Sequence, residues 1–335
     1  GVLHTPSTSN LCNHNMRLSN ECHTGHCLQI YPIWPKKAID QVWIGSIDCV
    51  ILIMWWPLGV IMRGKVVVKW GGGLITEKNQ LCTVNRDVIS SLVSTIITCH
   101  DNDLDVILVH GAGSFGHLRA KQWRLNEGKI DPSNFTADEF CSSQEQAVNL
   151  VRKDMLTLNS IIMEELTRAD ISAAVLPPHN WVNGTGESFE GDLTLFAGAP
   201  EGIVMVTYGD VVDCDEPLKF GILSGDDLVT RLAIEVPNVK RLVFAIGGVD
   251  GILRCPPNRA TEDDLIEIWS PDIEFEGEHK SDIDVTGGIG LKAARGAKVA
   301  QNGIEVMMVS GQHPQRVADA CIGVETRGTK VVYNR

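Results

Sequence analysis

The chain has 335 residues, of which 44% are hydrophobic, so it is long enough to bury one large core or two smaller ones. Its formal net charge is −13 and its basic residues form no stripe, so we expect no nucleic-acid partner. The ten cysteines show no paired Cys-x-x-Cys spacing. We therefore expect no metal site, although Cys22 and Cys27 lie near several histidines, and we expect reduced thiols in a cytoplasmic protein.

Residues 1–61 differ in composition from the rest of the chain and lead into the apolar run Val50–Met62. This run is short for a membrane span, and Pro57 would kink a helix there. A signal anchor is the alternative, but no small-residue cleavage site follows, and we expect no membrane partner. We expect residues 1–61 to be an N-terminal extension, either disordered or an artefact of the gene model with Met62 as the natural start. Residues 62–335 are expected to form one folded domain.

From Gly64 onward, short apolar runs alternate with stretches of helical periodicity. In chain order, the pattern predicts a strand at 66–69, a helix at 85–100, a strand at 106–109, a helix from 118, a mostly helical stretch at 135–165, and strands at 171–176 and 202–207. It then predicts a hairpin from 211–213 and 220–223, a helix starting at 224–227, a strand at 241–246, a helix carrying Lys292, and strands at 306–309 and 330–333. This alternation predicts an α/β fold, a three-layer αβα sandwich around a mainly parallel sheet.

The stretch Val106–His117 places three glycines directly after a buried strand. Glycines let the backbone approach a ligand closely, and a helix start favours an anion, so this turn suits a bound phosphate. His117 adds a donor that can carry charge near neutral pH. Three alternatives stay open. Gly111, Gly113 and Gly116 also fit the dinucleotide pattern G-x-G-x-x-G, they approach the spacing of a P-loop without its Lys and Ser/Thr, and they can serve a tight turn alone.

Four glycine-bearing turns fall at the carboxyl ends of predicted strands or at helix starts, where open α/β sheets bind ligands. They are residues 71–73, 111–116, 247–251 and 287–290. Three lysines of this acidic chain lie beside the turns, namely Lys69, Lys78 and Lys292. One redox dinucleotide needs a single such turn, whereas several turns with adjacent cations fit two phosphorylated ligands placed end to end. The pattern therefore indicates phosphoryl transfer, in which the protein aligns two anions and neutralises the charge between them.

Together these motifs resemble the amino acid kinase superfamily. Six collinear elements within residues 64–335 carry the resemblance: Lys69-Trp-Gly-Gly-Gly-Leu-Ile-Thr-Glu-Lys78, His110-Gly-Ala-Gly-Ser-Phe-Gly-His117, Tyr208-Gly-Asp210, Ser224-Gly-Asp-Asp227, Val249-Asp-Gly251 and Asp284-Val-Thr-Gly-Gly-Ile-Gly-Leu-Lys292. His117 narrows it to the isopentenyl phosphate kinases, because this histidine separates kinases of phosphate acceptors from relatives that phosphorylate carboxylates or carbamates. The resemblance implies that residues 62–335 are a catalytic domain with an amino acid kinase-like fold. The implied reaction is ATP-dependent phosphorylation of isopentenyl phosphate to isopentenyl diphosphate in isoprenoid biosynthesis, with Mg²⁺, by a homodimer.

The resemblance also implies roles for individual residues. Those expected at the ATP phosphates are Lys69, Gly71, Gly72, Gly73 and Gly113, with Lys78 stabilising the transferring phosphoryl group. Those expected around the rest of the nucleotide are Asp227, Asp250, Gly251, Gly288 and Lys292. Those expected at the acceptor are Ala112, Gly113 and His117 for its phosphate, Gly191 for closure of the substrate end, and the region 135–162 for the isoprenoid tail. The implied catalytic set is Lys69, Lys78 and His117, and no residue is expected to bind a metal.

The chemistry of the acceptor supports the implied role of His117. The acceptor is a dianion approached by another anion, so a donating imidazole at a helix start lowers their repulsion. A phosphate acceptor is already a deprotonated nucleophile, so neither a general base nor a covalent intermediate is needed.

Two departures from the family pattern affect the expected nucleotide contacts. Gly73 stands where the family usually carries Ser, and Gly247-Gly248 stands where it carries Thr-Asp. Three other functions remain as alternatives: a kinase of another small phosphate or phosphonate, such as a fosfomycin-type kinase, a catalytically weak nucleotide-binding regulator, and an oxidoreductase that binds nicotinamide. The lysines and the histidine of the implied site argue against the regulator.

Overall fold

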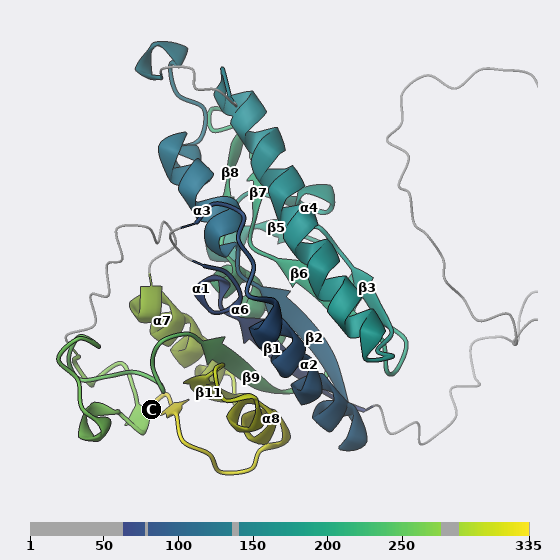
Figure 1. The fold of residues 1–335 in the computed structure, drawn as a ribbon, viewed down its shortest axis with the longest axis vertical. Helices are drawn as coiled ribbons and strands as arrows, with labels where there is room; N and C mark the ends of the chain where they lie inside the picture. The colour runs from purple at the N-terminus through teal and green to yellow at the C-terminus, as the bar shows by residue number, and fades with distance from the viewer. Residues whose placement is uncertain (1–62, 78–79, 136–140, 276–287, 335) are drawn as a thin grey trace, which may run out of the picture. The chain divides into compact units, whose positions relative to one another are not determined.

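The computed structural model describes residues 63–77, 80–135, 141–275 and 288–334 (Figure 1). The chain divides into two units, 1–59 and 60–335, and the fold described below is that of the second. The predicted extension 1–61 and Lys78 lie outside the described residues, as does part of the region predicted to hold the isoprenoid tail. No helix among the described residues is long and apolar enough to cross a membrane.

The middle layer is a sheet of eight strands in the order β10-β12-β11-β9-β1-β2-β6-β3. The strands are β1 (Gly64–Trp70), β2 (Leu104–His110), β3 (Ala173–Val175), β6 (Val204–Tyr208), β9 (Val239–Ile246), β10 (Ile268–Trp269), β11 (Glu305–Ser310) and β12 (Thr329–Val331). Within the described part of the chain, neighbours in this sheet run parallel except for β11 and β12. The predicted mainly parallel sheet is confirmed.

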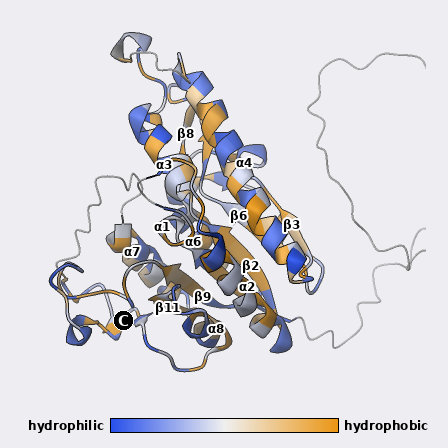
Figure 2. Cartoon of the chain, in the orientation of Figure 1, coloured by the Kyte–Doolittle hydropathy of each residue, from blue (hydrophilic) through white to orange (hydrophobic). Residues whose placement is uncertain are grey.

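The strands separate two hydrophobic cores. Val66 and Val68 of β1 pack into one core and Val67 packs into the other, because successive side chains of a strand point to opposite faces. The helices over the first core are α2 (Arg86–Asp101), α3 (Gly113–Gln122), α4 (Gln144–Arg168) and α8 (Pro314–Ile322), and those over the second are α6 (Gly225–Glu235) and α7 (Gly288–Gln301). Figure 2 shows the apolar stripes of α2 and α4. The three-layer αβα sandwich is confirmed.

A second, smaller sheet has the strand order β5-β4-β7-β8. Its strands are β4 (Val182–Asn183), β5 (Glu190–Gly191), β7 (Asp210–Asp213) and β8 (Phe220–Leu223). The predicted hairpin is confirmed as the antiparallel pair of β7 and β8. The sequence does not predict β4 and β5, since two-residue strands carry no periodicity. Short helices α1 (Gly72–Ile75) and α5 (Thr194–Ala197) lie in the connections.

Two helix boundaries differ from the prediction. The helix predicted from Leu118 begins at Gly113, because the residues of the glycine turn themselves form its first turn. Helix α4 begins at Gln144 rather than near Phe135, because the side chain of Ser143 accepts a backbone N–H of the first turn and caps the helix there. The earlier start of α3 places the glycine turn on a rigid element.

Candidate functional site

A cavity of about 650 Å³ lies at the carboxyl ends of the parallel strands β1, β2, β6 and β9. Open α/β sheets bind their ligands at this edge. The predicted site residues that line this cavity are Lys69, Gly71, Gly72, Gly73, Ala112, Gly113, His117, Gly288 and Lys292. The structure therefore brings together residues from the first strand, two glycine turns and α7, as the sequence predicts.

The first two glycine turns touch each other at backbone distance. A Cβ added to Gly72 would lie 2.3 Å from the backbone nitrogen of Gly113, and one added to Gly111 would lie 2.4 Å from that of Gly72. Gly113 has φ +50°, in the left-handed region that favours glycine. Thr76 joins the turns, because its Oγ1 donates to the Gly72 carbonyl at 2.8 Å and accepts the backbone N–H that follows Gly113 at 2.9 Å. At positions 72, 111 and 113, where the two turns meet, only glycine fits.

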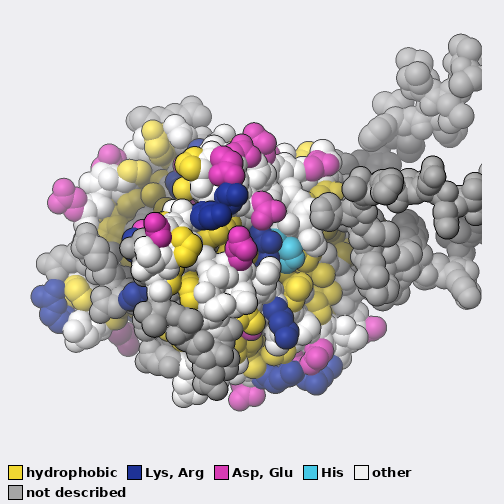
Figure 3. Space-filling view, turned by 90° about the horizontal axis from the view of Figure 1, so that it is seen from above, with side chains coloured by type: hydrophobic (Ala, Val, Ile, Leu, Met, Phe, Trp, Pro, Cys, Tyr) yellow, Lys and Arg dark blue, Asp and Glu magenta, His cyan; other side chains and the backbone are white. Residues whose placement is uncertain are grey.

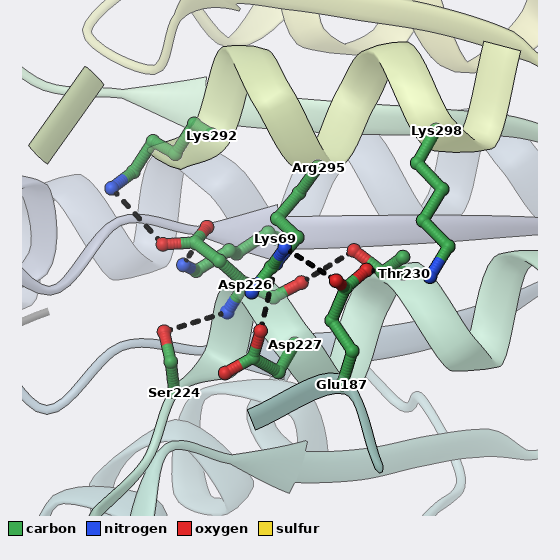
Figure 4. Close-up of polar contacts among 9 residues, drawn as sticks. All are labelled: Lys69, Glu187, Ser224, Asp226, Asp227, Thr230, Lys292, Arg295 and Lys298. Atoms are coloured by element: carbon green, nitrogen blue, oxygen red, sulfur yellow. Dashed lines mark hydrogen bonds and ion pairs between the residues drawn. The ribbon is translucent and has the colours of Figure 1, made fainter. Parts of the chain in front are cut away.

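One buried carboxylate joins the two described lysines of the site. Asp226 Oδ1 accepts from Lys69 Nζ, and its Oδ2 accepts from Lys292 Nζ at 3.3 Å (Figure 4). Burial alone would raise the pKa of the Asp226 carboxyl, but the ammonium groups of Lys292 and Lys69 outweigh burial and hold the pKa below its usual range. Asp226 is therefore an anion that keeps two cations at one wall of the cavity.

Asp226 lies in the first turn of helix α6, which fixes its position. Ser224 caps the helix, since its Oγ accepts the backbone N–H of Asp226 at 3.1 Å. Gly225 lies against the Lys69 side chain, where a Cβ would come within 3.2 Å of Cε. We did not predict Asp226 from the sequence. The sequence signal is a pair of acids in the first turn of a helix with a serine cap, which marks the turn but not which of the two acids meets Lys69.

The far half of the cavity is apolar. Gly116 and Ala120 of α3 share a face of the helix with Gly113 and His117, because they lie three to four residues apart. Opposite them the cavity is lined by Val151 and Met155 of α4 and by Val211 and Ile222 of the β7–β8 hairpin. The predicted tail region 135–162 thus contributes two side chains to the cavity, and the hairpin contributes a wall that we did not predict. His117 lies where the glycine turns meet this apolar half.

Four other predicted residues lie outside the lining of the cavity. Asp227 pairs instead with Arg295 Nε at 2.8 Å. A Cβ on Gly251 would lie 2.4 Å from Thr329 Oγ1, and one on Gly191 would lie 2.9 Å from the Trp181 ring, so these two glycines permit close packing. The fourth, Asp250, pairs with two arginines.

Asp250 links the third glycine turn to two arginines. Its Oδ1 accepts from Arg316 Nη1 at 2.6 Å, and its Oδ2 accepts from Arg327 Nε at 2.6 Å. Partial burial would raise the pKa of Asp250, but the hydrogen bonds and charges of Arg327 and Arg316 hold it below its usual range. Both carboxylate oxygens are thus engaged by the protein, and Asp250 anchors the turn that starts at Gly247.

A buried histidine supports the second glycine turn from behind. His110 is fully buried at the end of β2, its Nδ1 lies 3.2 Å from the Gly111 carbonyl, and its ring lies 4.8 Å from that of Tyr208. Burial lowers the pKa of His110 to about 4. The ring is therefore neutral near neutral pH, and His117 is the histidine of this motif that lines the cavity.

Asp210, which lines the cavity, and the fully buried Asp226, which does not, are both engaged by protein partners. Asp226 is shared by two lysines, and Asp210 Oδ2 lies 2.6 Å from His179 Nδ1. Among the described residues, no three His, Cys, Asp or Glu side chains group as metal ligands. Magnesium usually reaches such sites on the phosphates of a nucleotide, held by few protein ligands. The described residues therefore include no dedicated protein cage for Mg²⁺. On the face seen in Figure 3, Lys and Arg side chains are interspersed with Asp and Glu.

Comparison with known proteins defines the class. Residues 64–310 match the model of the Amino acid kinase family, so the chain belongs to this family. It is similar to the isopentenyl phosphate kinase of Methanothermobacter thermautotrophicus, with 29% identity over 271 residues that cover 79% of this chain and 98% of that protein. It is 30% identical over 265 residues to the isopentenyl phosphate kinase of Thermoplasma acidophilum, covering 78% and 97%. A crystal structure of the T. acidophilum enzyme as a product complex matches with a TM-score of 0.62 and 27% identity, covering 80% of this chain and 99% of that one.

Proposed function

We propose that this chain transfers the terminal phosphoryl group of ATP to isopentenyl phosphate, which yields ADP and isopentenyl diphosphate. One observation carries the proposal: a single cavity joins a half built from glycine turns and lysines to an apolar half, and His117 lies between them. An anionic head with a short hydrocarbon tail is complementary to such a cavity. The relatives named isopentenyl phosphate kinase support this acceptor.

The half with glycine turns and lysines binds the donor. We assign the ATP phosphates to the double turn at Gly72 and Gly113 and to the ammonium groups of Lys69 and Lys292. Lysine suits this role because its ammonium is a compact charge on a flexible stem that can follow a moving phosphoryl group. Asp226 keeps both ammonium groups at the cavity wall when no nucleotide is bound, so they require little reorganisation when the phosphates arrive.

The transfer is a direct in-line displacement. An oxygen of the acceptor phosphate forms a bond to the γ-phosphorus of ATP, and the bond to the bridging β–γ oxygen breaks, so that its electron pair leaves with ADP. The acceptor oxygen already carries negative charge, so no side chain has to remove a proton. The work left for the protein is alignment and neutralisation of charge, which Lys69 and Lys292 supply from one side. Lys78 lies outside the described residues, and its predicted role at the transferring group stays a prediction.

The acceptor phosphate is assigned to Ala112, Gly113 and His117 at the start of α3. Three features favour an anion there: the positive end of the helix dipole, the backbone N–H groups of the first turn and the imidazole. The hydrocarbon tail then extends between α3, α4 and the β7–β8 hairpin. Small side chains at Gly116 and Ala120 leave room for it.

The metal, the remaining nucleotide residues, the oligomeric state and the location predicted from the sequence remain proposals. We propose that Mg²⁺ enters with the ATP phosphates and neutralises part of their charge. Asp250 and Gly251 lie outside the cavity lining, so we propose that they shape the turn beside the nucleotide rather than contact it. The homodimer and the cytoplasmic location remain predictions from the sequence.

The test is a substrate panel on the full chain with Mg·ATP. Isopentenyl phosphate, fosfomycin and inorganic phosphate are compared as acceptors, with ADP release and the phosphorylated product measured together. The proposal predicts that isopentenyl phosphate has the highest kcat/KM of the three and that product forms in equal amount to ADP. A preference for fosfomycin would keep the class of reaction and move the function to the phosphonate alternative.

A further inference from the structure

A second set of ion pairs lies next to the Asp226 carboxylate that Lys69 and Lys292 share (Figure 4). Arg295 Nε donates to Asp227 Oδ1 at 2.8 Å, and its Nη1 lies 2.8 Å from Glu187 Oε2. Lys298 Nζ donates to the other carboxylate oxygen of Glu187 at 2.8 Å. Asp227 is the neighbour of Asp226 on α6, and Glu187 lies in the 3₁₀ turn Gly186–Ser188 before β5. Acidic and basic side chains thus alternate from Asp227 through Arg295 and Glu187 to Lys298.

These contacts become more exposed with distance from the cavity. The Asp227 side chain is 7% exposed, that of Arg295 is 21% exposed and that of Lys298 is 49% exposed. Solvent screens the outer pair strongly and the inner pair weakly. The contact between Arg295 and Asp227 is therefore the member of this set with the largest expected influence on the position of α7.

Helix α7 carries both Lys292 and Arg295, three residues apart and so on one face of the helix. Lys292 reaches Asp226 with a flexible stem at 3.3 Å, a contact that places its ammonium but fixes the helix backbone weakly. The guanidinium of Arg295 is planar and bridges two carboxylates on two different elements, which fixes its geometry more closely. Arg295 therefore adds a polar tether to the apolar packing of α7, the helix from which Lys292 extends.

We propose that Arg295 is a positioning residue for the phosphoryl transfer, acting through Lys292, and that Asp227 serves as its anchor rather than as a contact to the nucleotide. This inference rests on the proposed function. Burial raises the pKa of Asp227 and the Arg295 guanidinium offsets this in part. Without Arg295, the Asp227 carboxylate would lose its partner and keep the repulsion of the neighbouring Asp226 and of Glu187.

The test compares three variants of the full chain: Arg295→Met, Arg295→Lys and the matched control Lys298→Met, which lies on the same helix and contacts the same Glu187. Steady-state kinetics with ATP and isopentenyl phosphate are measured beside equilibrium binding of ATP and thermal unfolding. Arg295→Met is expected to lower kcat on the order of tenfold to a hundredfold, because small misplacements of a catalytic group cost rates of that size. KM for isopentenyl phosphate should stay within about twofold, since Lys292 is assigned to the donor side.

Arg295→Lys should recover part of kcat, because its ammonium can pair with Asp227 but cannot bridge Asp227 and Glu187 as the guanidinium does, and Lys298→Met should leave kcat within about twofold. A folded Arg295→Met protein with wild-type kcat would overturn the inference. Equal changes in kcat and KM together with lower thermal stability, unrescued by Arg295→Lys, would overturn it too, since they indicate a structural role alone. If the wild-type chain ignores isopentenyl phosphate but uses another acceptor, the proposed function fails and the same comparison on that acceptor decides the role of Arg295. Wild-type inactivity on every acceptor would overturn both.

Discussion

Lys69 and Asp226 are 157 residues apart in the sequence, yet their side chains form a buried ion pair at the edge of the central sheet. Lys69 ends β1 and Asp226 begins α6, so the pair joins the strand layer to the helix layer beside the cavity. The same carboxylate also receives Lys292. One buried carboxylate thus holds two ammonium groups beside the cavity.

Asp226→Asn should lower kcat about a hundredfold with a small change in KM for the acceptor. The amide keeps the shape of the carboxyl group but loses the charge that holds two ammonium groups in place, and such preorganisation contributes mainly to the transition state. Initial rates over a grid of ATP and acceptor concentrations separate the two constants. The matched control is Asp319→Asn on α8, whose carboxylate accepts a solvent-exposed hydrogen bond from Gln315 Nε2 at 2.8 Å. Equal kinetics of both variants would contradict the role of Asp226.

The stability contributed by Asp226 should depend on pH in one direction. Its pKa in the folded protein lies below the ordinary value of 3.8, so its contribution is fully present above pH 3.8 and is lost as the pH falls through the folded value. Breaking a buried ion pair by removal of one partner costs about 3–5 kcal/mol. The difference in free energy of unfolding between wild type and Asp226→Asn, from urea titrations, should be constant near neutral pH and shrink in acid below pH 3.8. A difference in free energy of unfolding that grows in acid would contradict a lowered pKa of Asp226.

Gly72→Ala should weaken ATP binding and destabilise the protein. The added methyl would lie 2.3 Å from the Gly113 backbone nitrogen, so the two turns would have to separate. We expect a loss of about 1–3 kcal/mol in the free energy of unfolding, as for other overpacked sites. Gly198→Ala is the control, because its φ is −87° and its nearest new contact is an ordinary 3.4 Å. Chemical denaturation and calorimetric ATP titration of both variants measure the effect, and identical values for the two would show that the contact between the turns is unimportant.

Met155→Ala should shift the acceptor preference toward longer hydrocarbon tails. Met155 is fully buried and lines the apolar half of the cavity, so truncation lengthens that half. We expect kcat/KM for a ten-carbon prenyl monophosphate, relative to isopentenyl phosphate, to rise about tenfold, the lower end of the discrimination that hydrophobic pockets achieve for one methylene group. Leu158→Ala on the same helix, buried but outside the cavity lining, should lose stability without the shift. An unchanged ratio in Met155→Ala would place the tail elsewhere.

The strands and the glycine turns are predictable from the sequence because their signals are local. A buried strand such as β2 is a short run of β-branched residues, and the glycines that follow it mark a turn whatever the rest of the fold does.

Helix α8 has typical end signals in Pro314 and in Gly323, which has φ +82°. The sequence pattern does not predict this helix, because its apolar positions, which include Val317, Ala320 and Cys321, are mostly small.

Sequence patterns do not determine which of two adjacent residues makes a given contact. Asp226 and Asp227 both lie in the first turn of α6, and which of them faces Lys69 depends on the rotation of the helix against β1. Asp250 and Gly191 are similar cases, because their partners, Arg316, Arg327 and Trp181, come from elements whose packing the pattern does not specify. Periodicity shows that a residue is near a strand end but not which neighbour it meets.

The most direct test of the account is turnover of isopentenyl phosphate by the full chain, compared with its His117→Ala variant. Mg·ATP and isopentenyl phosphate are supplied, and ADP and isopentenyl diphosphate are quantified in parallel. The account predicts equal formation of both products by the wild type. In the variant, kcat/KM for the acceptor should fall by about two orders of magnitude or more while ATP binding and the fold are retained, because the donor half does not include His117. Wild-type binding of ATP without any isopentenyl diphosphate, or a folded His117→Ala protein with unchanged kinetics, would contradict the acceptor site proposed for this cavity.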